Sequence, residues 1–173
     1  MSYANDDRLD KMVGVLIKGC EPKSSLQSSK YSNIFMDGNA IFSYGYHYPL
    51  VVKIGNKWLV NTTKYSPTTG RQTSKLYGAL NKNNVDKDNV YSVPLEYDRY
   101  RNSAFDVIQG AINSLIVEKQ ENEKRLPTLR KGCNPRAVCL AEIAYVDEML
   151  PKLVALQERE RSSSQWQMYL ARA

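Results

Sequence analysis

The chain has 173 residues, of which 42% are hydrophobic, and 24 Lys and Arg stand against 18 Asp and Glu. This length and composition allow a folded core and exclude wholesale disorder. No apolar run is long enough to cross a bilayer. Three Cys and one His are too few for a disulfide framework or a zinc site, so we expect a cytoplasmic protein without a metal or cofactor.

The N-terminal segment predicts an amphipathic helix over residues 6–18. Leu9, Met12, Val13, Leu16 and Ile17 repeat at the three-and-four spacing that places side chains on one face of a helix. Cys20 continues this apolar pattern, so we expect it, like Cys139, to be a buried thiol.

Residues 33–62 predict an antiparallel β-meander. Short runs of β-branched and aromatic residues are separated by Asp37-Gly38 and Gly55-Asn56, which supply the positive φ angles that two-residue hairpin turns require. Residues 90–93 predict a fifth strand.

Three further helices are expected, over residues 69–81, 103–125 and 135–160. Continuous apolar character over residues 137–146 predicts deep burial, and Pro151 predicts a kink or a restart. The whole chain, 1–173, is therefore expected to form one α+β domain. A four- to five-stranded antiparallel meander would pack against helices, and a C-terminal helical hairpin would complete the core or form a homodimer.

Basic residues are unevenly distributed along the chain. The longest stretch without Asp or Glu runs from Gly38 to Val85, and the net charge of +6 lies within it, because basic and acidic residues balance elsewhere. Its six basic residues are Lys53, Lys57, Lys64, Arg71, Lys75 and Lys82. This pattern predicts a surface that attracts anions, although a strand-rich segment is also poor in acidic residues for structural reasons.

The start of the helix at 69–81 is the most unusual segment. Thr68 and Thr69 lie beside Lys64, Arg71 and Lys75, and a helix N-terminus favours a phosphate or carboxylate. The glycine spacing excludes a P-loop. The alternative is a capped surface helix with a solvated basic face.

Aromatic residues alternate along the second strand and beyond it. In an unbroken strand Phe42, Tyr44, Tyr46 and Tyr48 would share one face, where they would either stack on bases or pack beneath a helix. The lone His47 between them is either a general base or an ordinary turn residue. No catalytic residue is assigned.

Ser43-Tyr44-Gly45 is followed about twenty residues later by Tyr65-Ser66-x-Thr68-Thr69-x-Arg71-Gln72. This pattern resembles a small domain of unknown function found in proteins of bacteriophages and other mobile elements, over about residues 42–80. Members of that family often have His after the Arg, where this chain has Gln72. The resemblance implies a phage or prophage source, hence the cytoplasm of a host cell, and no established activity.

We therefore expect a non-enzymatic accessory protein that binds nucleic acid or a nucleoprotein complex through the six basic residues, with Tyr44, Tyr46 and Tyr48 as stacking groups. One alternative is a protein-interaction module that uses the C-terminal helices to inhibit a host defence or replication complex. Another is an enzyme acting on a nucleotide or polynucleotide, which would need His47 near Tyr65 and Arg71 in a cleft.

Overall fold

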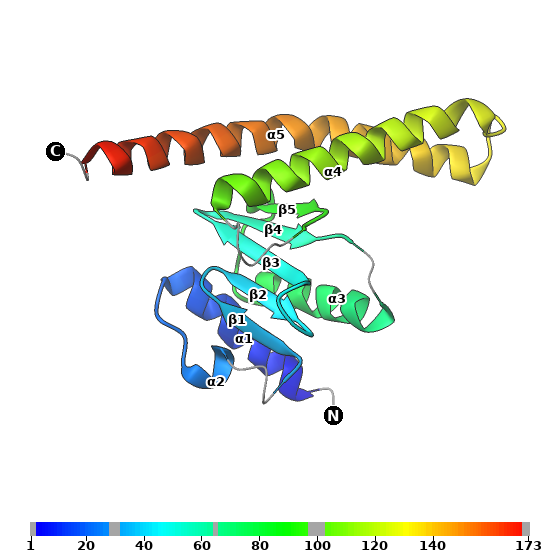
Figure 1. Ribbon diagram of the computed structural model, residues 1–173. Helices are drawn as coiled ribbons and strands as arrows, with labels where there is room; N and C mark the ends of the chain where they lie inside the picture. The colour runs from blue at the N-terminus through cyan, green and yellow to red at the C-terminus, as the bar shows by residue number, and fades with distance from the viewer. Residues whose placement is uncertain (1–2, 28–31, 64–65, 97–102, 171–173) are drawn as a thin grey trace. The chain divides into compact units, whose positions relative to one another are not determined.

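The computed structural model describes residues 3–27, 32–63, 66–96 and 103–170 (Figure 1). Its mixture of helices and one five-stranded sheet confirms the expected α+β class. In chain order the elements are α1 (Tyr3–Lys18), α2 (Ser24–Gln27), β1 (Ile34–Asp37), β2 (Ala40–Ser43), β3 (Pro49–Ile54), β4 (Lys57–Asn61), α3 (Pro67–Lys82), η2 (Lys87–Asn89), β5 (Val90–Val93), α4 (Ala104–Arg125), η3 (Leu126–Thr128) and α5 (Asn134–Leu170).

The chain divides into two compact units, Met1–Tyr100 and Arg101–Ala173. The first contains the sheet with α1, α2 and α3, and the second contains α4 and α5. The expectation of a single domain over residues 1–173 stays a prediction.

The sheet has the strand order β1-β2-β3-β4-β5. Strands β1 to β4 are antiparallel neighbours, which confirms the meander, and the turn residues Gly38 and Gly55 both have positive φ angles. Strand β5 instead pairs parallel to β4, from Trp58 opposite Val90 to Asn61 opposite Val93. Helix α3 connects these two strands and returns the chain to the same end of the sheet, so β5 is added by a helical crossover and not by a hairpin.

Helices α1 and α3 pack side by side and cover one face of the sheet (Figure 1). Because side chains alternate along a strand, every second strand residue points to these helices. The largest fully buried side chains of this core are Leu9, Met12, Ile34, Met36, Ile41, Leu50 and Leu76. The apolar stripe predicted for the first helix is therefore confirmed as far as Leu16, whereas Ile17 is 45% exposed.

Helices α4 and α5 of the second unit form a hairpin joined through η3. A capping box of Ser103 and Asp106 begins α4, as the sequence pattern indicates. Helix α5 continues through Pro151 without the expected restart, and the residues on either side of it, Met149 and Leu153, are buried.

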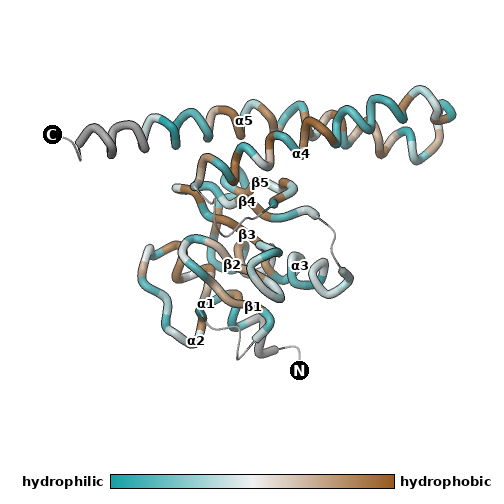
Figure 2. The backbone as a smooth tube through the Cα atoms, viewed as in Figure 1, coloured by the Kyte–Doolittle hydropathy of each residue, from teal (hydrophilic) through white to brown (hydrophobic). Residues whose placement is uncertain are grey.

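The deep burial expected for residues 137–146 is wrong. Val138 is 48% exposed and Leu140 is 47% exposed, whereas Cys139 and Val146 are buried. The physical reason is that a neighbouring helix covers only one side of α5, so apolar residues on the other sides face solvent. Figure 2 shows hydrophobic and hydrophilic residues following one another along both helices.

Glu118 on α4 supplies a prediction about the pH dependence of stability. Burial raises the pKa of Glu118, and the nearby carboxylates of Glu142 and Glu121 raise it further. A raised pKa in the folded state means that stability is fully present below the ordinary pKa of glutamate and is lost as the pH rises through the folded pKa. Glu118→Gln should therefore raise the melting temperature at pH 7 and lose that advantage near pH 4.

Thermal unfolding of the wild type and the variant at both pH values checks this, with Glu158→Gln on an exposed site of α5 as the control. An advantage of the same size at both pH values would show that the charge of Glu118 does not cause it.

Candidate nucleic-acid interface

The N-terminus of α3 is closed by its own side chains. Ser66 precedes the helix, the N–H of Thr69 donates to Ser66 Oγ at 3.2 Å, and the N–H of Ser66 donates to Thr69 Oγ1 at 2.9 Å. Thr69 is only 1% exposed. Thr69 therefore caps the helix and is not accessible to a bound anion, which corrects its assignment as a binding residue.

Two distant parts of the sequence motif meet between the sheet and α3. Ser43, at the end of β2, and Gln72 of α3 are both buried, and the Ser43 hydroxyl donates to Gln72 Oε1. The next residues, Tyr44 and Gly45, have positive φ angles and turn the chain away from the strand. The motif thus fixes α3 on the sheet, and it leaves Thr68 and Arg71 exposed.

The outer face of α3 is basic and sparsely covered. Arg71 is exposed, Lys75 is half-buried, and the helix contains no carboxylate. Small residues, Gly70, Ser74 and Gly78, lie on the same side of the helix by their spacing. A Cβ atom built on Gly70 or Gly78 would meet nothing within 4 Å, so another molecule can approach the helix backbone closely here.

Lys82 lies at the other end of α3 and forms an ion pair with Asp10 of α1. The sequence stretch that contains Lys82 has no acidic residue of its own. In the fold, the carboxylate of Asp10 lies beside it, because α1 packs against α3. Lys82 contributes less to a positive surface than the sequence predicts.

Lys53 and Lys57 do not join this face. They pair with Trp58 and Ile54 across the β3–β4 hairpin and so point to opposite sides of the sheet. Lys57 Nζ donates to Asn89 Oδ1 at 2.7 Å and lies 5.1 Å from the centre of the Tyr91 ring, and Lys53 Nζ lies 5.9 Å from the centre of the Trp58 ring.

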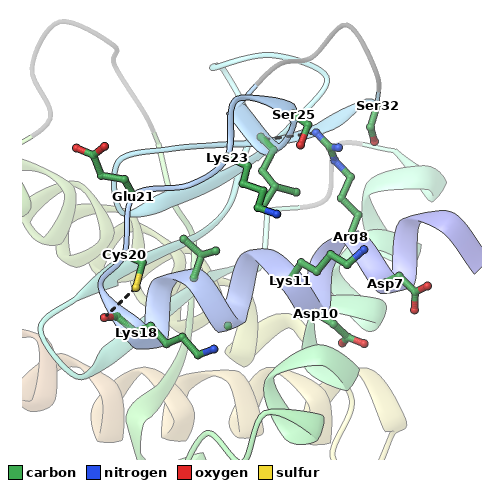
Figure 3. A pocket seen from close by; sticks show the side chains of 13 residues that line it. Asp7, Arg8, Asp10, Lys11, Lys18, Cys20, Glu21, Lys23, Ser25 and Ser32 are labelled. Atoms are coloured by element: carbon green, nitrogen blue, oxygen red, sulfur yellow. Dashed lines mark hydrogen bonds between the residues drawn. The ribbon is translucent and has the colours of Figure 1, made fainter.

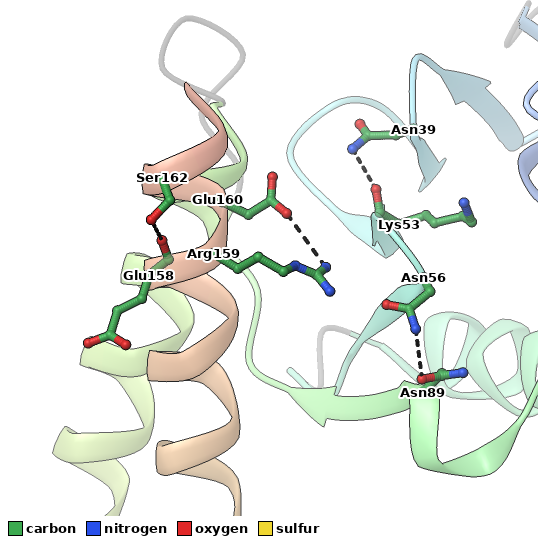
Figure 4. A network of polar contacts seen from close by, with 8 residues as sticks. All are labelled: Asn39, Lys53, Asn56, Asn89, Glu158, Arg159, Glu160 and Ser162. Carbon is green, nitrogen blue, oxygen red and sulfur yellow. Dashed lines mark hydrogen bonds and ion pairs between the residues drawn. The ribbon is translucent and has the colours of Figure 1, made fainter. Parts of the chain in front are cut away.

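Asparagine side chains near Lys53 hold turns in place (Figure 4). Asn39 Nδ2 donates to the carbonyl oxygen of Lys53 at 2.7 Å, and Asn56 Nδ2 donates to Asn89 Oδ1 at 3.4 Å. Through its bond to Asn89, Lys57 stabilises η2, the short helix directly before β5. Lys64, the remaining predicted basic residue, lies outside the described residues.

The single face that Phe42, Tyr44, Tyr46 and Tyr48 would share in an unbroken strand does not form, because β2 ends at Ser43. Tyr46 packs edge-on against Phe35 at 5.1 Å between ring centres, and the buried Tyr48 donates its hydroxyl to the carbonyl oxygen of Thr63 at 2.6 Å. Only Tyr44 of the three tyrosines is well exposed, at 48%.

Tyr77 lies by its spacing at the edge of an apolar stripe on α3 that also contains Leu76 and Leu80. It is 38% exposed, next to the small residues of the outer face, and its hydroxyl shares a hydrogen bond with Ser92 Oγ at 2.6 Å. Its position at the edge of the stripe, beside Ser74 and Gly78 on the helix, is the sequence signal that would have predicted the exposure of Tyr77.

His47 lies exposed in the turn after β2. Neither the pocket beside α1 nor the smaller one beside the β3–β4 turn is lined by His47 or Arg71, and Tyr65 lies outside the described residues. Among the residues that the structure describes, no cluster of three metal-binding side chains exists. In the same part of the chain, no helix is both long and apolar enough to span a membrane.

Comparisons of the chain with protein-family models, with curated proteins and with solved structures find no match. The resemblance of residues 42–80 to a domain of phage and mobile-element proteins therefore stays a prediction.

Proposed function

We propose that this protein binds nucleic acid, or a nucleoprotein complex, through the outer face of α3. The observation that carries the proposal is the presence of Arg71 and Lys75 on one accessible side of a helix that has no carboxylate. Such side chains neutralise phosphates and release the counterions that surround a nucleic acid.

The residues next to Arg71 and Lys75 are suited to contact the sugar-phosphate backbone of a nucleic acid. Gly70, Ser74 and Gly78 let a sugar-phosphate chain approach the helix closely, and Thr68 lies exposed at the helix end whose dipole favours anions. The partly exposed rings of Tyr44 and Tyr77 are suited to stacking on unpaired bases. We infer a non-enzymatic accessory role, in the cytoplasm of a host cell if the chain is phage-encoded.

Reversing the two central charges tests this function. The variant Arg71→Glu/Lys75→Glu should bind a labelled oligonucleotide at least about tenfold more weakly than the wild type, because two cations become anions beside the phosphates. The matched control is Lys124→Glu/Lys131→Glu, which changes the net charge equally at two exposed positions of the second unit. Equal losses in both variants would show that net charge, and not the α3 face, determines binding.

A second function has its own supporting observation. The α4–α5 hairpin exposes large apolar side chains, which favours a protein-interaction module that binds a host complex or a second copy of this chain. These side chains are Ile116, Val117, Val138, Leu140, Tyr145 and Val154. A stable protein partner together with no affinity for bare nucleic acid would favour this function over the first.

A further inference from the structure

A large pocket lies in the first unit, away from the outer face of α3. It has a volume of about 1060 Å³ and lies between α1 and the segment that follows it, which includes α2 (Figure 3). Pockets for small organic molecules usually occupy about 300 to 1,000 Å³, so this one is large enough for such a ligand.

Local structure explains why the pocket is open. Gly19, with a φ angle of +62°, turns the chain back after α1, and α2 anchors its return by burying Leu26 in the core. Arg8 of α1 bridges the two sides, because its Nε donates to the carbonyl oxygen of Ile34 at 2.9 Å and its Nη2 to that of Leu26 at 3.4 Å. Burial lowers the pKa of Arg8. The gap between α1 and residues 20–25 is thus held from both ends.

The pocket combines apolar lining with lysines. Val15 and Leu26 supply apolar surface, and the side chains of Lys11 and Lys23 extend into the gap from opposite walls (Figure 3). Both lysines are exposed, and in the part of the chain that the structure describes neither has a hydrogen-bond or ion-pair partner. Two unpaired ammonium groups that converge over apolar surface attract an anion.

The carboxylates of the pocket do not cancel these two charges. Asp10 is paired with Lys82 of α3, and Figure 3 shows the carboxylates of Asp10 and Glu21 directed away from the gap. Asp7 lies one helical turn before Lys11 on α1, and these two described residues form no ion pair with each other. The interior between Lys11 and Lys23 therefore remains positive.

We propose that this pocket binds a small organic anion that has an aromatic or aliphatic body and one phosphate or carboxylate group. The body lies against Val15 and Leu26, and the anionic group lies between Lys11 and Lys23. This site is separate from the proposed nucleic-acid face, and its test does not depend on nucleic-acid binding.

Cys20 provides a reporter inside the pocket. It lines the cavity and is exposed, contrary to the burial expected from the sequence, because Gly19 ends α1 before it. Cys139 is buried and Cys133 is half-buried. The rate at which a thiol reagent modifies Cys20 can therefore be followed separately by peptide mass spectrometry. The reagent is the neutral disulfide 2,2′-dithiodipyridine. The Cys20 thiolate attacks one of its sulfur atoms, the mixed disulfide forms, and pyridine-2-thiolate leaves.

The probe is phenyl phosphate, and its two halves are tested beside it as inorganic phosphate and phenol. Phenyl phosphate should slow the labelling of Cys20 in a saturable manner, by at least about fivefold, whereas each half alone should slow it less than about twofold. Lys11→Gln/Lys23→Gln should abolish the protection, and Lys124→Gln/Lys131→Gln should keep it. Melting temperatures of the variants check that the fold is intact.

Three results would overturn the proposal. These are the absence of saturable protection up to about 10 mM phenyl phosphate, equal protection by inorganic phosphate alone, and full protection in the Lys11→Gln/Lys23→Gln variant.

Discussion

Replacing Asn61 by Ala should lower the free energy of unfolding by about 3 kcal/mol. Asn61 is 1% exposed at the end of β4, and its amide group connects three segments. Its Nδ2 donates to the carbonyl oxygens of Pro49 at 2.8 Å and Leu95 at 3.3 Å, and its Oδ1 accepts from the N–H groups of Leu95 at 3.1 Å and Thr63 at 2.9 Å. The truncation leaves these backbone groups without their partner, and a buried polar group that loses its hydrogen bond costs about 1 to 3 kcal/mol.

Urea denaturation of the wild type and Asn61→Ala measures this loss. The matched control is Asn39→Ala, which removes one hydrogen bond at an exposed turn and should cost less than about 1 kcal/mol. If the two substitutions cost the same, the buried amide does not hold the strands together as described.

The hydrogen bond between Ser43 and Gln72 should produce a measurable coupling energy. Each of Ser43→Ala and Gln72→Leu should destabilise the protein by about 1 to 2 kcal/mol, because each leaves the other side chain buried without a partner. The double variant should cost less than the sum by about 1 kcal/mol, since no unsatisfied group remains.

This double-mutant cycle is also measured by urea denaturation. The control pairs Gln72→Leu with Thr73→Ala, whose hydroxyl bonds only to the carbonyl oxygen of Thr69 within α3. We expect the control pair to be additive. Additivity in the Ser43 and Gln72 pair would mean that the motif does not join the sheet to α3 through this contact.

The sequence predicts those parts of the fold that depend on neighbouring residues. Asp37-Gly38 and Gly55-Asn56 specify hairpin turns, and Ser103 with Asp106 specifies a helix start, because the required φ angles and hydrogen bonds lie within a few residues. The two turns and the start of a helix near residue 103 were predicted correctly from the sequence alone.

The features that the sequence missed depend on contacts between distant segments. Strand β5 is parallel because α3 crosses the sheet, and the apolar residues of α5 are exposed because a neighbouring helix covers one side. Periodicity reports which face of a helix is apolar, but not how many neighbours it has.

The predicted binding residues were dispersed for the same reason. Lys57 bonds to Asn89 of η2, Lys82 pairs with Asp10, and Tyr48 is in the core. Each of these contacts joins residues that are far apart in the sequence. Among the predicted basic and hydroxyl residues that the structure describes, Thr68, Arg71 and Lys75 remain together on α3.

The salt dependence of binding tests the proposed function most directly. Fluorescence anisotropy of labelled single- and double-stranded oligonucleotides is measured from low to physiological salt, with the wild type and with Arg71→Glu/Lys75→Glu. We predict that the logarithm of the wild-type affinity falls linearly with the logarithm of the salt concentration, and that the slope of the variant on duplex is shallower by about 2. Identical slopes, or no binding by the wild type even at low salt, would contradict a nucleic-acid interface on α3.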